Sequence, residues 1–330
     1  MTDTSHPKTS CLDPVRRRVL AASACAWGLP MIGSRAFAAE PEKLRIGFQK
    51  SSTLMIFLKS RGILEKTLAP LNVQVQWNEF TSGLPLLEAL NIGAIELSAD
   101  VADAVPPFAL AAGAQLTYYA IENPSPQAQA IVVRKDSPVT SLAQLKGQKV
   151  AFAKGAGAHF LLLEALAQNG LSIKDIEPAY LSPADGRAAF ENGAVAAWVI
   201  WDPFLAAVQR QSGARILLDG TKVAAYRRFY LAATPFVQRR ADVVSTVYAE
   251  LQRAGEWIKA NPGPAAEWHA PFVGLDAPTV EVANLRRTYR VQPVDADALG
   301  EQQRIADAFT QAQIIPRKVT IAESPVWRPA

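Results

Sequence analysis

Residues 149–170, KVAFAKGAGAHFLLLEALAQNG, contain the pattern that decides the fold. Residues 149–153 read as a short buried strand, and a glycine-rich loop leads from it into a helix over 159–169 that Gly170 ends. A strand that passes through a glycine turn into a helix is the building unit of α/β domains. The same unit recurs on both sides of this stretch.

The alternation of strands and helices falls into two series. A first series places strands at 44–48, 73–77, 95–98 and 116–120, with helices at 54–64, 84–90 and 105–112. A second series places strands at 130–133, 149–153, 180–181, 197–201, 215–218 and 229–232, with helices at 159–169, 185–192 and after Asp202-Pro203. We therefore expect two α/β lobes, each a mostly parallel sheet flanked by helices.

The last third of the chain is predicted to be helical. Helices are expected at 243–260, 279–289 and 299–312, with proline-rich connections between them. We expect this part to pack back on the first lobe. The predicted domain boundaries are 39–128 with 235–330 for lobe 1 and 129–234 for lobe 2.

Composition describes an ordinary globular protein, with 49% hydrophobic and 19% charged residues in a chain of 330. The net charge of +4 lies mostly at the N-terminus, because residues 1–38 hold five basic and two acidic side chains. The remainder is close to neutral, which gives no reason to expect a nucleic-acid partner.

Residues 1–38 read as an export signal. Arg16-Arg17-Arg18-Val19-Leu20 precedes a mildly apolar run, and Ala36-Phe37-Ala38 matches a cleavage site. The arginines resemble a twin-arginine signal, although general secretion stays open. Lipidation at Cys25 also stays open. We expect a periplasmic protein that is cleaved near Ala38, and the apolar run is too short and too interrupted for a membrane span.

The inventory of reactive side chains limits the chemistry. Both cysteines, Cys11 and Cys25, lie in the predicted signal, and only two histidines, His159 and His269, follow it. The mature chain therefore has no disulfide, no thiolate nucleophile and no Cys/His zinc site. A G-x-S-x-G nucleophile elbow is also missing. We expect no enzyme, no cofactor and no metal.

Three loops that follow strands are candidate anion sites. Residues 154–159 offer glycines and a helix N-terminus, residues 49–53 offer hydroxyls and Lys50, and residues 100–106 follow the third strand. Plain turns and helix capping are the alternatives, and His159 could donate to a ligand or face solvent. The candidate ligand-binding residues from these loops are Gln49, Lys50, Ser51, Ser52, Asp103, Gly155, Ala156, Gly157 and His159.

Aromatic rings at strand ends could form an apolar cleft wall in the second lobe. Trp201, beside Asp202-Pro203, is placed in the cleft, and both Trp201 and Asp202 are candidate ligand-binding residues. Asp202 is also expected to cap the following helix. Trp198 is expected in the core, and Tyr230 stays open between cleft and core.

Six stretches carry a resemblance to a known family: residues 46–50 (IGFQK), 84–93 (LPLLEALNIG), 130–138 (AIVVRKDSP), 145–151 (LKGQKVA), 182–190 (SPADGRAAF) and 193–204 (GAVAAWVIWDPF). Together they resemble the aliphatic-sulfonate-binding proteins. The resemblance covers about residues 43–235 strongly and the C-terminal third weakly.

The resemblance implies a two-lobed type 2 periplasmic binding protein. Such a receptor would be a monomer that captures an alkanesulfonate and delivers it to an ABC permease, which its ATPase drives. Taurine, nitrate, an aromatic sulfonate or a pyrimidine precursor are alternative ligands, and a desulfinase-like enzyme is an alternative function. The chain departs from the family pattern at Ala102, Val105, Gly186 and Ala196, where ligand range could change.

Overall fold

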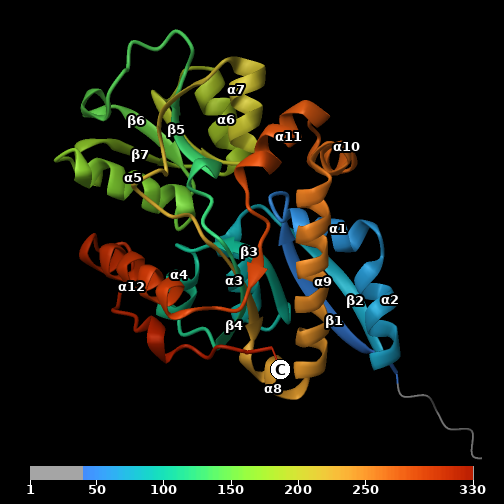
Figure 1. Cartoon of the computed structure of the whole chain (residues 1–330). Coiled ribbons are helices and arrows are strands. Elements are labelled where there is room, and N and C mark those ends of the chain that lie inside the picture. The colour runs from blue at the N-terminus through green and yellow to red at the C-terminus, as the bar shows by residue number, and fades with distance from the viewer. Residues whose placement is uncertain (1–39, 330) are drawn as a thin grey trace, which may run out of the picture. The chain divides into compact units, whose positions relative to one another are not determined.

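The computed structural model describes residues 40–329. The predicted export segment 1–38 lies outside the described residues. Two sheets organise the described part of the chain (Figure 1). The six-stranded sheet runs in the order β11 (Val291–Gln292), β4 (Leu116–Glu122), β10 (Arg228–Ala233), β3 (Leu97–Ala102), β1 (Glu42–Gln49) and β2 (Val73–Phe80). The five-stranded sheet runs β7 (Glu177–Tyr180), β6 (Lys149–Phe152), β8 (Ala197–Trp201), β5 (Gln129–Val133) and β9 (Arg215–Asp219).

The two α/β lobes expected from the sequence are confirmed, but both sheets are mixed. Strands β1 to β4 share one direction in the first sheet, and β6 to β9 share one direction in the second. A reversed strand is inserted into the interior of each sheet, β10 in the first and β5 in the second, and the short edge strand β11 also runs antiparallel to β4. Strands β10 and β5 each come directly after the chain has crossed from the other lobe, so each enters its sheet from the opposite end.

The expectation that residues 229–232 complete the second lobe is wrong. Strand β10 pairs with β3 and β4 of the first sheet, so Tyr230 belongs to the first lobe. Its side chain is fully buried, and its hydroxyl donates to Glu122 Oε1 at 2.7 Å. Tyr230 is therefore a core residue and not a cleft wall.

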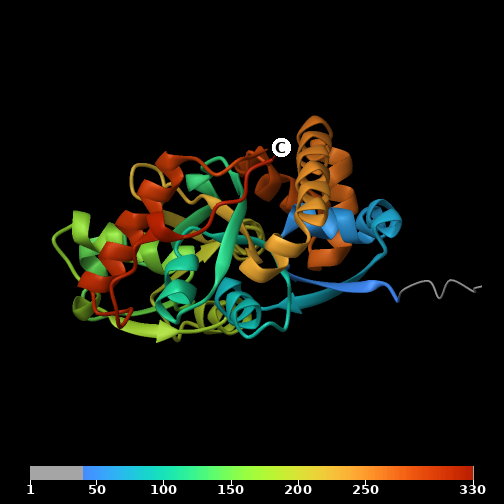
Figure 2. The ribbon, with the colours of Figure 1, turned by 90° about the horizontal axis from the view of Figure 1, so that it is seen from below.

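Helices cover both faces of the first sheet. One face carries α1 (Thr53–Ser60), α2 (Ile63–Leu68) and α9 (Ala241–Ala260), which lie side by side (Figure 2). The other face packs against α3 (Gly83–Asn91), α4 (Pro106–Ala111) and the start of α12 (Ala296–Gln311). Successive side chains of a strand point to opposite faces of the sheet, so both faces carry apolar side chains that helices cover. In β10, Tyr230 and Ala232 face the first group of helices, and Phe229 and Leu231 face the second.

The second sheet is flanked by α5 (Gly157–Gln168), α6 (Pro183–Glu191) and α7 (Phe204–Ser212). The expected core position of Trp198 is confirmed, since its side chain is 1% exposed. Gly186 of α6 packs on it, and a Cβ at this glycine would lie 2.7 Å from Trp198 Nε1. The departure at Gly186 therefore serves core packing beneath the tryptophan.

The C-terminal helices contact both lobes. Helices α8 (Thr234–Arg239), α10 (Pro262–Val273) and α11 (Ala277–Arg286) join α9 and α12 in this part. Helix α11 packs on α7 of the second lobe, whereas Phe309 of α12 packs between Phe108 of α4 and His159 of α5. Residues 262–273 form a helix where we expected only a connection. Pro262 and Pro264 occupy its first turn, where prolines are tolerated.

Candidate functional site

The cavity between the two sheets lies beyond the ends of their parallel strands, where ligands bind in open α/β sheets. Its volume is about 310 Å³. The first lobe contributes the loop after β1 and the end of β2, and the second lobe contributes the start of α6, Trp201 at the end of β8 and Phe204 at the start of α7. The lining residues are Gln49, Lys50, Ser51, Glu79, Phe80, Thr81, Ser182, Pro183, Ala184, Trp201 and Phe204. We call this the large cavity.

A second, small cavity of about 20 Å³ shares Gln49, Ser51 and Trp201 with the large one. This volume admits about one water-sized group. The N-termini of α3 and α5 both line it, and no side chain within residues 40–329 caps either end. The lining residues are Gln49, Ser51, Gly83, Ala102, Val105, Ala156, Gly157, Trp201, Tyr226 and Arg228.

Close packing at the small cavity requires its two glycines. A Cβ at Gly157 would lie 2.6 Å from Tyr226 Cε2 and 3.0 Å from Ala102 Cβ. A Cβ at Gly83 would lie 2.9 Å from Val105 Cγ2. Ala102 and Val105, where this chain departs from the pattern of the family it resembles, therefore set the width of the small cavity.

A buried cluster of two arginines and two carboxylates supports this cavity. Arg228 Nη1 lies 2.7 Å from Asp100 Oδ2, and Arg287 Nη2 lies 3.3 Å from the same oxygen and 2.6 Å from Glu122 Oε1. The two positive charges balance the two negative ones, which is the condition for burying all four. Although burial lowers the pKa of Arg287, the Glu122 and Asp100 carboxylates raise it overall. The guanidinium is therefore charged.

Arg228 keeps one donor available. It is 2% exposed and lines the small cavity, yet its Nε has no hydrogen-bond partner among the described residues. A buried, unpaired N–H next to two helix N-termini is unfavourable unless an acceptor arrives. The arrangement can therefore accept an anionic oxygen.

Six of the sequence-predicted residues line the two cavities. Gln49, Lys50, Ser51 and Trp201 line the large cavity, and Ala156 and Gly157 line the small one. Ser52 lies just behind them, where its hydroxyl accepts the Gln49 N–H at 3.1 Å. Three loops from both lobes are thus brought together at one place.

His159 and Gly155 lie away from both linings. The Gly155 N–H donates to His159 Nδ1 at 3.2 Å, and the imidazole packs 4.8 Å from the Phe152 ring. The solvent-facing alternative for His159 is wrong, because the side chain is fully buried. Burial lowers its pKa to about 4, so the ring is neutral and holds the glycine loop in place.

Asp103 and Asp202 are also buried behind the walls. Asp103 Oδ2 accepts the Arg227 N–H at 2.9 Å, and burial raises the pKa of Asp103 to about 7. The expectation that Asp202 is the N-cap of the following helix is wrong, because α7 begins at Phe204 and Pro203 is its N-cap. Asp202 Oδ1 instead accepts the Ala206 N–H from inside the first turn, at 3.0 Å. Burial raises its pKa to about 6, against the opposing charge of Arg286.

Several lining residues were missed from the sequence. Arg228 had a usable signal, because an arginine at the head of the apolar stretch 228–233 must be paired if that strand is buried. No sequence signal marks the other missed residues, because each occupies an ordinary turn, strand end or helix start. These residues are Tyr226, Glu79, Phe80 and Phe204.

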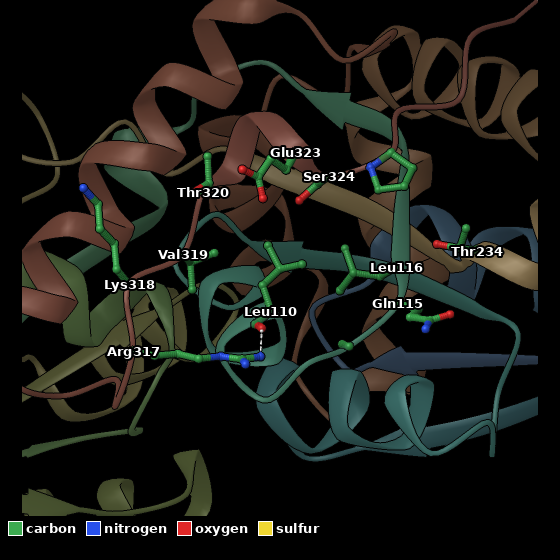
Figure 3. A pocket seen from close by; sticks show the side chains of 12 residues that line it. Leu110, Gln115, Leu116, Thr234, Arg317, Lys318, Val319, Thr320, Glu323 and Ser324 are labelled. Atoms are coloured by element: carbon green, nitrogen blue, oxygen red, sulfur yellow. Dashed lines mark hydrogen bonds between the residues drawn. The ribbon is translucent and has the colours of Figure 1, made fainter.

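A wider hollow of about 480 Å³ lies beneath the C-terminal segment, at the start of β4 and just beyond the end of β10 (Figure 3). Arg317 reaches across it and donates to the Leu110 carbonyl at 2.9 Å. Most of its polar groups, including Lys318, Glu323 and Ser324, come from that segment (Figure 3). Within residues 40–329, no buried donor without a partner lines this hollow, so it offers no counterpart to Arg228 Nε.

Within residues 40–329, no helix combines the length and apolar character that a membrane crossing requires. In the same part of the chain, no group of three or more histidine, aspartate and glutamate side chains could hold a metal ion.

Comparison with known proteins places the chain in a family. Residues 93–265 match the family described as NMT1/THI5 like. A curated Escherichia coli K12 relative, whose name assigns it to the aliphatic sulfonates-binding proteins, is 42% identical over 305 residues, 92% of this chain and 94% of its own length.

Solved structures agree with this placement. The periplasmic aliphatic sulphonate binding protein SsuA from Escherichia coli matches at a TM-score of 0.79 and 42% identity, over 88% of this chain and 93% of that one. The alkanesulfonate-binding protein SsuA from Xanthomonas axonopodis pv. citri, bound to MOPS, matches at 0.83 and 38%, over 88% and 100%. The chain therefore belongs to the aliphatic sulfonate-binding proteins of the NMT1/THI5-like family.

Proposed function

We propose that this protein is a periplasmic receptor that captures an aliphatic sulfonate and delivers it to the permease of an ABC importer. The observation that carries the proposal is a pair of neighbouring cavities that share lining residues, one small and beside Arg228, the other larger and lined in part by apolar side chains of both lobes. A sulfonate has the matching form, because one permanent negative charge spread over three oxygens is attached to an apolar tail.

The small cavity is the proposed head-group subsite. Two uncapped helix N-termini present N–H groups and the positive ends of their dipoles to it, which favours an anion. Arg228 Nε and the Ser51 side of the β1–α1 loop supply further polar groups. Because the space admits about one water-sized group, one sulfonate oxygen enters it and the others stay at the junction with the large cavity.

The large cavity is the proposed tail subsite. Phe80 and Pro183 come from opposite lobes, and the rings of Trp201 and Phe204 meet edge to face with centroids 6.2 Å apart. A volume of about 310 Å³ lies at the lower end of the range for small-molecule sites, roughly 300–1,000 Å³. Burial of an alkyl chain between these walls supplies the apolar part of the affinity.

A receptor fits the chain better than an enzyme. The related proteins of high identity are named as binding proteins, and the chain beyond residue 38 contains no cysteine to act as a nucleophile. Export through residues 1–38 and delivery to a permease with its ATPase are parts of the same proposal. We also propose that the receptor works as a monomer, since both walls of the site come from one chain.

A thermal-shift panel tests the proposal. The mature protein is heated with C2–C10 alkanesulfonates, taurine, nitrate and sulfate, because a ligand that binds only the folded state raises the melting temperature. We expect alkanesulfonates to produce the largest shifts. A panel in which no sulfonate shifts the melting temperature, or in which nitrate or sulfate shifts it more, overturns the assignment.

A further inference from the structure

Two consecutive arginines at the end of α11 bind opposite walls of the cleft. Helix α11 ends at Arg286, and Arg287 follows with extended backbone (φ −97°, ψ 147°). The change from helical to extended backbone sends the two side chains in different directions. Arg286 reaches the second lobe and Arg287 reaches the first. In Figure 1, α11 lies between α7 and α10, which agrees with its packing contacts.

Arg287 holds the head-group side of the cleft. Its Nη1 donates to the Ser51 carbonyl at 2.7 Å and to Thr53 Oγ1 at 3.3 Å. Its Nη2 lies 3.3 Å from Asp100 Oδ2, the oxygen that also accepts from Arg228 at 2.7 Å. The Asp100 carbonyl in turn accepts from Gln49 Nε2 at 3.0 Å. Ser51, Arg228 and Gln49 all line the small cavity.

Arg286 holds the opposite wall. Its Nη1 lies 3.1 and 3.2 Å from the two carboxylate oxygens of Asp202, and its Nη2 donates to Gln209 Oε1 at 2.7 Å. Asp202 directly follows Trp201, which lines both cavities. The Asp202 side chain is 2% exposed, so its charge depends on Arg286. A movement of the Trp201 wall must therefore move Arg286 or break this ion pair.

We propose that Arg286 and Arg287 are positioning residues that couple the two walls of the ligand cleft. The coupling runs from Trp201 through Asp202 to Arg286, and then from Arg287 to the Ser51 loop. It makes the head-group subsite sensitive to the position of the second lobe. The expected effect of this coupling on ligand capture rests on the proposed function. The coupling between the two walls does not depend on that function.

The first test needs no ligand. Hydrogen–deuterium exchange of the ligand-free protein is compared between wild type and Asp202→Asn, a nearly isosteric change confined to the second lobe. We expect faster exchange in residues 197–206 and also in residues 49–53 of the first lobe. Arg286→Gln should give the same two changes, and Arg286→Lys should restore part of the protection. If exchange changes only around residue 202, the coupling is absent.

Arg210→Gln is the matched control. Arg210 joins α7 to the other end of α11, through Thr279 Oγ1 at 3.0 Å and Asp276 at 3.9 Å, but it touches neither cavity wall. Exchange in residues 49–53 should stay at the wild-type rate in this variant. If Arg210→Gln raised the exchange rate in residues 49–53 as much as Arg286→Gln does, the cause would be a general loosening of α11. That result would overturn the proposal.

The second test measures dissociation of 1-octanesulfonate by stopped-flow tryptophan fluorescence. We expect Arg286→Gln and Asp202→Asn each to raise the dissociation rate, on the order of tenfold, and the double variant to add nothing further. Dissociation at the wild-type rate in both variants contradicts the proposal. Failure of the wild type to bind contradicts the proposed function instead, while the exchange experiment still decides the coupling.

Discussion

Arg228 and Asp100 form a fully buried ion pair, with Nη1 2.7 Å from Oδ2, at the base of the small cavity. The pair joins β10 to β3, two strands that lie next to each other only because the chain has returned from the second lobe. The return of the chain to the first lobe at β10 therefore also places the positively charged Arg228 side chain at the proposed head-group subsite. This relationship connects the topology to the proposed function.

Arg228→Lys tests the cation at the head group. Lysine keeps the charge for Asp100 but loses the guanidinium Nε that has no partner among the described residues. We expect the affinity for an alkanesulfonate to fall ~10- to 100-fold, the size of a hydrogen bond to a charged group. Isothermal titration calorimetry measures it. Arg215 is the control: it lies away from the cavities, and its guanidinium donates to the Ser137 carbonyl at 2.7 Å. The Arg215→Lys variant should therefore bind the alkanesulfonate as the wild type does.

Gly157→Ala tests the close packing at the start of α5. The new Cβ would lie 2.6 Å from Tyr226 Cε2, so either the helix or the tyrosine must move. We expect a loss of about 1–3 kcal/mol in the free energy of unfolding, as for overpacked cores, together with weaker ligand binding. Urea denaturation measures the change in the free energy of unfolding.

Gly300→Ala provides the comparison, because Gly300 also lies in a helix but has room for a Cβ atom. A Cβ at Gly300, inside α12, meets nothing within 4 Å. Alanine there should stabilise the protein by roughly 0.5–1 kcal/mol, since it lowers the entropy of the unfolded chain. If both glycine variants destabilised the fold equally, the steric account of Gly157 would be wrong.

His269 should make the fold sensitive to acid. It is 2% exposed, both ring nitrogens lack partners within residues 40–329, and burial followed by the charge of Arg287 lowers its pKa to about 3. The unfolded chain binds a proton below pH ~6.5 that the folded one refuses, so stability falls as the pH drops. The expected loss from this residue is about 2 kcal/mol between pH 6.5 and 5.

His269→Phe isolates that contribution. Phenylalanine can keep the stacking on Trp268, whose ring lies 5.3 Å away at 15°. Urea unfolding of both proteins at pH 7 and pH 5 gives the comparison. The variant should lose less stability than wild type on acidification, and parallel losses would show that the histidine is not the cause.

Asp103 should act in the opposite direction. Burial raises its pKa to about 7, so between pH 4 and 7 the folded state holds a proton that the unfolded state has released. Stability therefore falls as the pH rises through this range. Asp103→Asn removes the effect while it can still accept the Arg227 N–H.

The measurement for Asp103 is unfolding by urea at pH 5, 6, 7 and 8. The stability of Asp103→Asn relative to wild type should increase by about 1.4 kcal/mol per pH unit up to pH ~7 and then level off. A difference that stays constant with pH would mean that Asp103 is ionised throughout.

Local sequence patterns predicted most of the fold. The strand–glycine–helix unit at 149–170 appears as β6 and α5, and the helices expected at 243–260 and 299–312 appear as α9 and α12 with small shifts. These elements have strong periodicity or glycine ends, so neighbouring residues alone specify them. The return of β10 to the first sheet could not be predicted in this way, because strand pairing depends on partners more than 100 residues away.

The proposed site was predictable to the extent that it consists of loops after strands. Ser51 and Gly157 stand out in such loops, and both line the small cavity. The apolar stretch that begins at Arg228 indicates that this arginine is paired, but it does not identify the partner, because Asp100 lies 128 positions away. Likewise, Arg286 and Arg287 look like surface arginines at a helix end until the tertiary contacts place them between the cleft walls.

A crystal structure of the mature protein with 1-octanesulfonate tests the central claim most directly. The account predicts one sulfonate oxygen in the small cavity, within hydrogen-bonding distance of Arg228 and the first turn of α5, and the alkyl chain between Phe80 and Trp201. Density that places the sulfonate elsewhere, such as among Lys318 and Arg317 beneath the C-terminal segment, with the cleft between the two sheets empty, would contradict it.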